Sequence, residues 1–305
     1  MRYREIGKSD LKVSPVCLGT MTFGTPVEQA AATKLTHAAI DHGINFIDTA
    51  NIYEGYTRHI GSPGGVSEEL LGKALSGRRE KVVLATKGSN AVGPEPEDRG
   101  LDRAHIMREI DRSLKRLRTD YVDIYYMHRP DPDTPIAESV AVFNELIDAG
   151  KARYWGFSNY SAAETREMLD ACDEGGFCRP IVNQPPFSLL KRDIEKDILP
   201  LCKREGIAVV PFQILQSGLL TGKYRRGQAP PAGSRMAEKV EWVRDVTDAT
   251  FDRLESIERC AKARGLTMIE HAITWTLRQP GVASVIIGSK RPAQIEEAIA
   301  AAERC

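Results

Sequence analysis

The stretch INFIDTA, residues 44–50, is a short apolar run that ends on the ionisable residue Asp48. The chain contains seven other short apolar runs: VSPVCLG (13–19), KVVLATK (81–87), YVDIYYMH (121–128), ARYWGFSN (152–159), PIVNQP (180–185), IAVVPFQ (207–213) and ASVIIG (283–288). Near-continuous apolar runs are typical of strands buried on both faces, as in a parallel sheet. The runs therefore predict eight buried parallel strands.

The segments between these runs carry apolar residues at helical spacing, for example at Ile106, Ile110, Leu114 and Leu117. Eight strand–helix repeats in 305 residues favour a (β/α)8 TIM barrel. An open doubly wound sheet is the main rival fold. Its GxGxxG dinucleotide fingerprint is absent, because CLGTMTFG (17–24) has the wrong spacing. The predicted fold is the barrel.

Two additions to the bare barrel are expected. The segment RYREIGKSDLKVS (2–14) alternates around GKSD and predicts a short N-terminal β-hairpin that plugs the barrel floor. The interval between the seventh and eighth strands is much longer than the others. It contains YRRGQAPPAGSRM (224–236), which predicts a long mobile loop, followed by helical segments over 251–265 and 267–279. No linker is visible, so residues 1–305 are expected to form a single domain.

Composition narrows the class of protein. The 42 basic and 42 acidic residues balance, which argues against nucleic acid or an anionic membrane as a partner. The first ten residues are too charged for a signal peptide, and no apolar stretch approaches the roughly 20 residues of a membrane span. The six cysteines show no CxxC pair or zinc spacing and predict free thiols. We therefore expect a cytoplasmic protein without a bound metal, and the oligomeric state stays open.

Ionisable residues occur at the ends of three consecutive predicted strands. These residues are Asp48, Lys87 and His128, and Tyr53 follows Asp48 closely in the chain. In a (β/α)8 barrel the carboxyl ends of the strands converge on one mouth. Each residue alone has an ordinary explanation, such as a hydrogen-bonded strand end or a packed ring with a wet hydroxyl. Their coincidence on neighbouring strands favours a catalytic site.

Proton transfer to a carbonyl oxygen would use all four residues. A free phenol has a pKa of about 10 and is a poor acid or base at neutral pH. We expect the Lys87 ammonium to lower the pKa of Tyr53, and the Asp48 carboxylate to keep that ammonium charged and in place. His128 would hold the substrate oxygen in line with the hydroxyl. This chemistry still requires a source of electrons.

The sequence resembles the aldo-keto reductase family over nearly its whole length. The matching motifs are GINFIDTANIY (43–53), SEELLGKAL (67–75), YMHRPD (126–131), WGFSNY (155–160), VNQ (182–184), SGLLTGKY (217–224) and VIIGSKRPAQIEEAIAA (285–301). The family is a (β/α)8 barrel that binds a nicotinamide cofactor without a Rossmann fold. Its Asp–Tyr–Lys–His tetrad matches Asp48, Tyr53, Lys87 and His128. The resemblance implies reduction of an aldehyde or ketone by hydride transfer, with Tyr53 as the general acid.

The resemblance also implies a cofactor site made of three groups of residues. The group expected at the nicotinamide is Ser158, Asn159, Gln184 and Phe212. The group expected along the pyrophosphate is Gln213, Leu215, Gly218 and Lys223. The group expected at the adenosine ribose and any 2′-phosphate is Ser289, Lys290 and Gln294. NADPH is favoured over NADH, because Lys290 and Arg291 supply positive charge although Gln294 replaces an arginine of some relatives.

Two other functions are compatible with the same residues. A lyase or aldolase could use Lys87 as a Schiff-base amine, since barrels often carry such a lysine. That reading leaves the carboxamide-binding residues without a purpose. A cofactor-binding regulatory subunit with little turnover, of the kind that resembles potassium-channel β subunits, could also retain the tetrad. For the reductase, the expected substrate is a small carbonyl compound, with sugar-derived compounds favoured.

Overall fold

Eight parallel strands form the centre of the part of the chain that the structure, a computed structural model, describes: residues 1–59, 61–243 and 246–305. The strands are β3 (Val16–Gly19), β4 (Phe46–Asp48), β5 (Val83–Gly88), β6 (Val122–Met127), β7 (Ala152–Phe157), β8 (Val182–Asn183), β9 (Ala208–Val209) and β10 (Val285–Gly288). They pair in the order β10-β3-β4-β5-β6-β7-β8-β9. Sequence order is therefore kept around the sheet, and the last strand joins the first.

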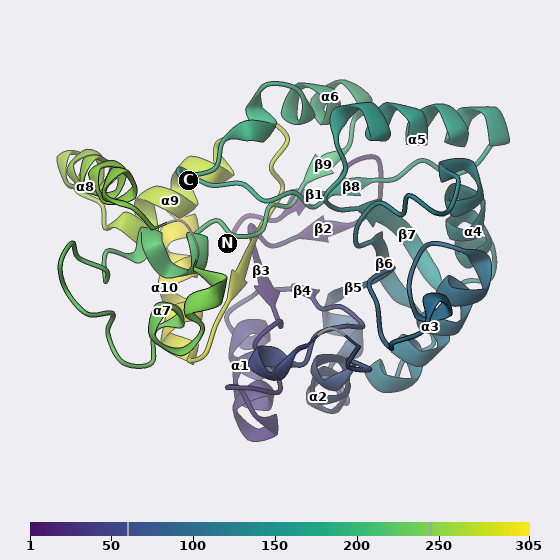
Figure 1. Cartoon of the computed structure of the whole chain (residues 1–305), viewed down its shortest axis with the longest axis horizontal. Helices are drawn as coiled ribbons and strands as arrows, with labels where there is room; N and C mark the ends of the chain where they lie inside the picture. The colour runs from purple at the N-terminus through teal and green to yellow at the C-terminus, as the bar shows by residue number, and fades with distance from the viewer. Residues whose placement is uncertain (60, 244–245) are drawn as a thin grey trace.

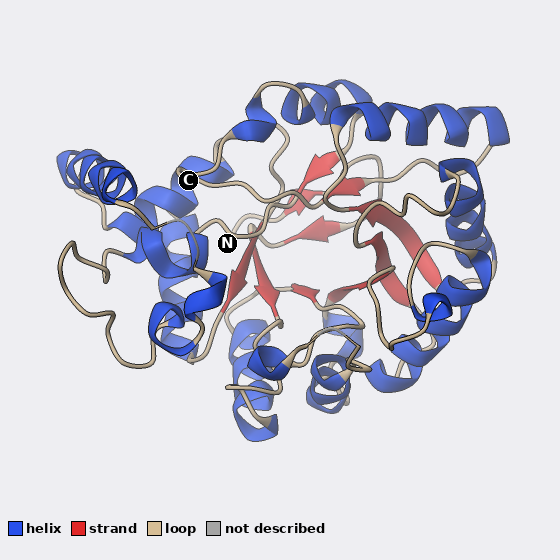
Figure 2. Cartoon of the chain, in the orientation of Figure 1, coloured by secondary structure: helices blue, strands red, loops and turns tan. Residues whose placement is uncertain are grey.

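Helices surround these strands (Figures 1 and 2). They are α1 (Gln29–Asp41), α2 (Val66–Ala74), α3 (Arg103–Leu117), α4 (Ile136–Asp148), α5 (Ala162–Gly175), α6 (Ile198–Glu205), α7 (Arg235–Glu238), α8 (Asp248–Ala263), α9 (Met268–Leu277) and α10 (Pro292–Ala302). Local sequence explains where several begin: the Asp102 carboxylate accepts the His105 amide at the start of α3, and a Ser161–Glu164 capping box starts α5. The alternation of strands and helices confirms the predicted (β/α)8 barrel.

The barrel closes between its first and last strands in the pairing order. Val209 forms a parallel bridge with Val282, and the Ala283 amide donates to the Val209 oxygen at 3.0 Å. The run 207–213 predicted a longer strand than β9, whose ladder ends at Val209. Pro211 explains the difference, because it has no N–H to donate to a neighbouring strand. Its carbonyl still accepts from the Ile286 amide at 3.0 Å.

A hairpin plugs the barrel floor, as predicted. Strands β1 (Arg4–Glu5) and β2 (Lys12–Val13) pair antiparallel. Ile6, Leu11 and Val13 are buried and belong to one cluster with side chains of the barrel interior, among them Cys17, Phe46, Ile124, Val182 and Ala208. The hairpin therefore fills the lower end of the barrel with apolar side chains and leaves the other end for polar groups.

The long interval between β9 and β10 holds α7, α8 and α9, which gather with α10 at the left of Figure 1. The helices predicted over 251–265 and 267–279 correspond to α8 and α9. The loop before them is tied to α8, because Arg225 forms an ion pair with Glu258 at 2.6 Å. In the described part of the chain, every helix is too short or too polar to cross a membrane.

Candidate active site

The four ionisable residues predicted at the strand ends lie together at the carboxyl end of the barrel. Lys87 on β5 donates from Nζ to Asp48 Oδ1 at 2.5 Å and to the Thr49 backbone oxygen at 2.8 Å. The same ammonium donates to the Tyr53 hydroxyl at 3.3 Å. The rings of Tyr53 and His128 meet edge to face, with centroids 5.9 Å apart. The structure thus brings the four residues of the tetrad together, and their catalytic roles stay predictions.

Lys87 and Asp48 form an ion pair that is closed to water, with exposures of 0% and 2%. Burial is the largest single influence and lowers the pKa of Lys87, but the charges and hydrogen bonds of Asp48 and Tyr53 together outweigh it and raise that pKa. Burial raises the pKa of Asp48, and Lys87 and a 2.8 Å hydrogen bond from Gln184 Nε2 offset part of that rise. An ammonium with a raised pKa and three acceptors is a poor nucleophile. This contact set argues against a Schiff base at Lys87.

Lys87 acts on Tyr53 in the predicted direction, but the overall shift of the Tyr53 pKa differs from the one expected. We expected the Lys87 ammonium to lower the pKa of Tyr53. Burial of the phenol is the larger influence and raises the pKa of Tyr53, while Lys87 lowers it by less and Asp48 adds to the rise. The pKa-lowering influence of Lys87 is therefore present as predicted, and the pKa of Tyr53 rises overall because burial of the phenol outweighs it. Tyr53 is therefore a protonated hydroxyl at neutral pH, ready to donate.

The imidazole of His128 is neutral. Burial lowers the pKa of His128 well below its ordinary value, and the positive charges of Lys87 and Arg129 lower it further. Within the described structure, His128 Nδ1 has no hydrogen-bond partner. A neutral imidazole carries one N–H donor and one acceptor nitrogen. His128 can therefore contact a substrate oxygen without carrying a charge.

A cavity of about 430 Å³ opens beside the tetrad. Asp48, Tyr53 and His128 line it, whereas Lys87 lies behind its wall. All residues predicted for the cofactor also line it: Ser158, Asn159, Gln184, Phe212, Gln213, Leu215, Gly218, Lys223, Ser289, Lys290 and Gln294. Segments far apart in sequence thus contribute to one cavity at the carboxyl ends of the strands, where barrels carry their active sites.

Comparison with known proteins identifies this arrangement. A model of the aldo/keto reductase family matches residues 15–304. The chain belongs to the aldo-keto reductase family. As an aldo-keto reductase with relatives that are named as oxidoreductases, it is an NAD(P)H-dependent enzyme, as the sequence predicted.

Three relatives illustrate the range of names in this part of the family. A probable voltage-gated potassium channel subunit beta from Arabidopsis thaliana is 39% identical, over 97% of this chain and 90% of its own length. An uncharacterized oxidoreductase from Bacillus subtilis is 35% identical, over 99% and 91%. The L-glyceraldehyde 3-phosphate reductase of Escherichia coli is 33% identical, over 99% and 87%. Each similarity covers nearly the whole barrel.

Two of the residues expected at the nicotinamide of this aldo-keto reductase, Ser158 and Asn159, are held in place by hydrogen bonds. Ser158 Oγ donates to the Gln184 backbone oxygen at 2.6 Å, and Asn159 Nδ2 donates to the His128 backbone oxygen at 2.9 Å. Asn159 adopts a left-handed φ of 67°, a conformation that asparagine tolerates better than most residues. Among the described residues, its side-chain oxygen accepts no hydrogen bond. The side-chain oxygen of Asn159 is therefore a free acceptor that suits the N–H groups of a carboxamide.

The residues expected along the pyrophosphate lie at the turn around η5 (Gln216–Thr221). Gly218 has a φ of 94°, which favours glycine, and a Cβ there would lie 2.8 Å from Lys223 Nζ. The Lys223 ammonium therefore lies directly over the glycine backbone at the cavity wall. A positive charge beside a glycine backbone, which no side chain shields, suits a phosphate group.

At the adenosine end, the structure differs from the expectation in the charge of Lys290, which is paired and not free. Gln294 Oε1 accepts from the Lys290 amide at 2.8 Å and from Ser289 Oγ at 3.3 Å, so its oxygen supports the start of α10. Lys290 Nζ forms an ion pair with Glu238 of α7 at 2.5 Å. The positive charge expected from Lys290 is therefore already countered by a carboxylate from the long β9–β10 interval.

Tyr56 and Arg235 are among the residues of the same cavity that sequence reasoning missed. The Arg235 guanidinium lies 5.7 Å from the Tyr56 ring centroid and 5.7 Å from that of Trp242, and the two rings meet edge to face. Cation–π contacts of this kind join the β4–α2 loop to the β9–β10 interval. The only sequence signal for Arg235 was its place in a long loop on the carboxyl side of a strand.

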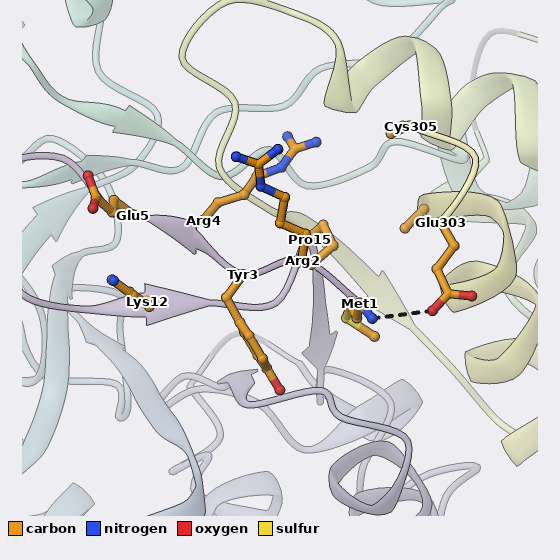
Figure 3. Close-up of a pocket in the computed structure, with 10 residues that line it drawn as sticks. Met1, Arg2, Tyr3, Arg4, Glu5, Lys12, Pro15, Glu303 and Cys305 are labelled. Atoms are coloured by element: carbon orange, nitrogen blue, oxygen red, sulfur yellow. Dashed lines mark ion pairs between the residues drawn. The ribbon is translucent and has the colours of Figure 1, made fainter.

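A second cavity of about 630 Å³ lies at the barrel floor (Figure 3). Tyr3, Arg4 and Lys12 of the hairpin line it, and an ion pair between the Met1 amine and Glu303 at 3.5 Å crosses its rim. It lies at the amino ends of the strands, the face of a barrel whose residues serve stability and not catalysis. In the described ranges of the chain, no group of three or more His, Cys, Asp or Glu residues could hold a metal ion.

Proposed function

We propose that this aldo-keto reductase reduces the carbonyl of an aldehyde or ketone to an alcohol, with NADPH as cofactor and Tyr53 as general acid. The observation that carries the proposal is the position of Lys87 Nζ, 2.5 Å from Asp48 Oδ1 and 3.3 Å from the Tyr53 hydroxyl. A protonated phenol beside an ammonium, at the wall of a cavity, suits proton transfer to a developing alkoxide.

The cavity fits a nicotinamide dinucleotide in size and chemistry. Its volume of about 430 Å³ lies in the range of small-molecule sites. The free oxygen of Asn159 suits a carboxamide, and the cations Lys223 and Arg235 suit phosphate groups. Lys290 would serve the 2′-phosphate of NADPH by leaving its ion pair with Glu238. Bound NADPH would supply the hydride that reduces the carbonyl carbon.

The tetrad would manage the proton. Tyr53 gives its proton to the carbonyl oxygen as negative charge develops there. The phenolate that remains is stabilised by the Lys87 ammonium, which Asp48 holds in place. The neutral ring of His128, edge to face with Tyr53, directs its N–H to the same oxygen and fixes the orientation of the carbonyl.

Small carbonyl compounds, with sugar-derived ones favoured, are the proposed substrates. The Escherichia coli relative supports this class, because it is named for a small hydroxylated aldehyde. The relatives named as potassium-channel subunits match the chain equally well along its length. Turnover is therefore the property to measure.

The test compares the wild type and Y53F on a panel of aldehydes, ketones and sugars, with NADPH absorbance as the readout. Y53F is expected to keep its NADPH affinity and to lose at least about 10²-fold in kcat, the scale of general-acid catalysis. Undiminished turnover in Y53F would remove Tyr53 as the acid. A wild type that binds NADPH tightly but reduces none of the panel, or a substrate carbon trapped on Lys87 by borohydride, would overturn the function.

A further inference from the structure

Asn51 lies between Asp48 and Tyr53 in the loop that joins β4 to α2, and it is 0% exposed. Its backbone N–H donates to the Lys87 backbone oxygen at 3.1 Å. Its side-chain Nδ2 donates to Glu109 Oε2 on α3 at 3.0 Å. Asn51 thus links the loop that carries Tyr53 to the strand that carries Lys87 and to a helix of the outer layer.

Glu109 is a buried carboxylate, 1% exposed, whose charge is balanced from the surface side of α3. Arg112 Nη1 lies 2.8 Å and Arg108 Nε 3.7 Å from its Oε1. The charged or titratable groups that face it in the described structure are Arg108, Arg112 and His105 of α3 and Tyr125 of β6. Its inner oxygen is left to the amide of Asn51.

The Asn51 side chain is an unusual choice for a buried loop residue. Its Oδ1 has no hydrogen-bond partner among the described residues, and an unpaired buried acceptor costs about 1–3 kcal/mol. Local rules of stability are broken most often where a site requires it. The amide group of Asn51 is therefore better explained by the hydrogen bond that its nitrogen donates to Glu109 than by a contribution to stability.

The rest of the loop is anchored at its two ends. The Thr49 oxygen accepts from Lys87 Nζ at 2.8 Å, and the Ser67 amide donates to the Tyr53 oxygen at 2.9 Å. Ser67 Oγ in turn donates to the Thr20 oxygen at 2.9 Å. Asn51 supplies the side-chain contact between these ends and α3, so it sets how far the loop lies from the barrel axis.

We propose that Asn51 and Glu109 are positioning residues, whose hydrogen bond holds the β4–α2 loop so that the Tyr53 hydroxyl meets the Lys87 ammonium. The proposal rests on the proposed function of Tyr53. Neither Asn51 nor Glu109 lines the cavity, so the pair acts through the tyrosine and not on a ligand. Loss of the Asn51–Glu109 hydrogen bond should lower kcat and leave the affinity for NADPH unchanged.

Exchanging donor and acceptor tests the pair. N51A is expected to lose about 10²-fold in kcat, the scale of a misplacement of about 1 Å, with an unchanged Kd for NADPH. N51D places two carboxylates together, one of which must bind a proton, so its activity is expected to fall as the pH rises. N51D/E109Q restores the hydrogen bond with the donor on α3, and is expected to recover kcat and a level pH profile.

D123N is the matched control. Asp123 is also a buried carboxylate, 3% exposed, that accepts the Leu84 amide at 2.9 Å and pairs with Arg79 and Arg153, but it lies at the start of β6. It should reproduce any general loss of stability without the pH dependence of N51D. Wild-type kcat in N51A, or a double variant no more active than N51D, would overturn the proposal.

Hydrogen exchange of the peptide 46–58, without cofactor, separates this proposal from the function on which it rests. Faster exchange is expected in N51A and E109A than in the wild type or D123N. If the wild type proves inactive, the proposed function fails, and the exchange result still decides whether the pair holds the loop. Equal exchange in all four proteins would overturn the positioning role.

Discussion

Removing one partner of the Asp48–Lys87 pair should destabilise the protein more than removing both. In K87M the Asp48 carboxylate stays buried, with the 2.8 Å hydrogen bond from Gln184 as its remaining polar contact to a side chain. In D48N the Lys87 ammonium keeps only the neutral oxygens of Thr49 and Tyr53. An uncompensated buried charge costs about 3–5 kcal/mol. Each single variant is expected to lose that much of a total stability of about 5–15 kcal/mol.

The double variant D48N/K87M removes both charges together. What remains is a loss of about 1–3 kcal/mol from polar groups that no longer find partners. The double variant is therefore expected to be more stable than either single variant, with a coupling energy of at least about 3 kcal/mol. A matched control is the exposed pair Arg103–Glu145, at 2.8 Å, where R103M and E145Q should show little effect and no coupling.

Urea unfolding at several pH values measures both effects. Burial raises the pKa of Asp48 above 3.8, and without Lys87 the hydrogen bond from Gln184 is the remaining side-chain contact that opposes that rise. The folded state of K87M then holds a proton that the unfolded state releases, so the deficit of K87M grows as the pH rises above 3.8 and shrinks below it. Additive losses, or a double variant weaker than both singles, would refute a buried ion pair as the source of the stability.

Two further predictions concern protonation. Because burial raises the pKa of Tyr53, kcat for reduction is expected to stay level from neutral pH to pH 10.0, the ordinary tyrosine value; a decline that begins well below it would contradict the protonated phenol. Arg225 and Lys262 lower the pKa of Glu258 to about 2 from 4.5, so E258Q should lose about 1 kcal/mol after solvent screening, a loss present above pH 4.5 that fades towards pH 2 in acid unfolding curves.

The parts of the site that follow from strand order could be predicted from the sequence. Asp48 and Lys87 end or nearly end neighbouring strands, and the topology of a barrel brings such positions together whatever their separation in the chain. The hairpin and the helices α8 and α9 were likewise readable, because each depends on local periodicity. The expected cofactor residues came instead from the resemblance to the aldo-keto reductases, and all of them line a single cavity.

Other features of the site could not be predicted from the sequence, because they depend on how deeply a side chain is buried and on contacts with residues far away in the chain. The direction of the pKa shift of Tyr53 follows from how far the phenol is buried, which no local pattern records. The partner of Lys290 is Glu238, 52 residues away at the end of the short helix α7. The contact of Asn51 with Glu109 spans 58 residues and depends on which face α3 turns inward. These contacts exist only once the helices have docked.

The N-terminal hairpin has a consequence for the chemistry at the opposite end of the barrel. Ile6, Leu11 and Val13 share a cluster with Cys17, and Cys17 lies near enough to Asp48 and Lys87 for both charges to act on its thiol. Water is thereby denied a route to the ion pair from beneath. The first thirteen residues therefore help to keep the surroundings of the Asp48–Lys87 pair apolar, so their removal is expected to change the pKa values of both groups without any change to either side chain.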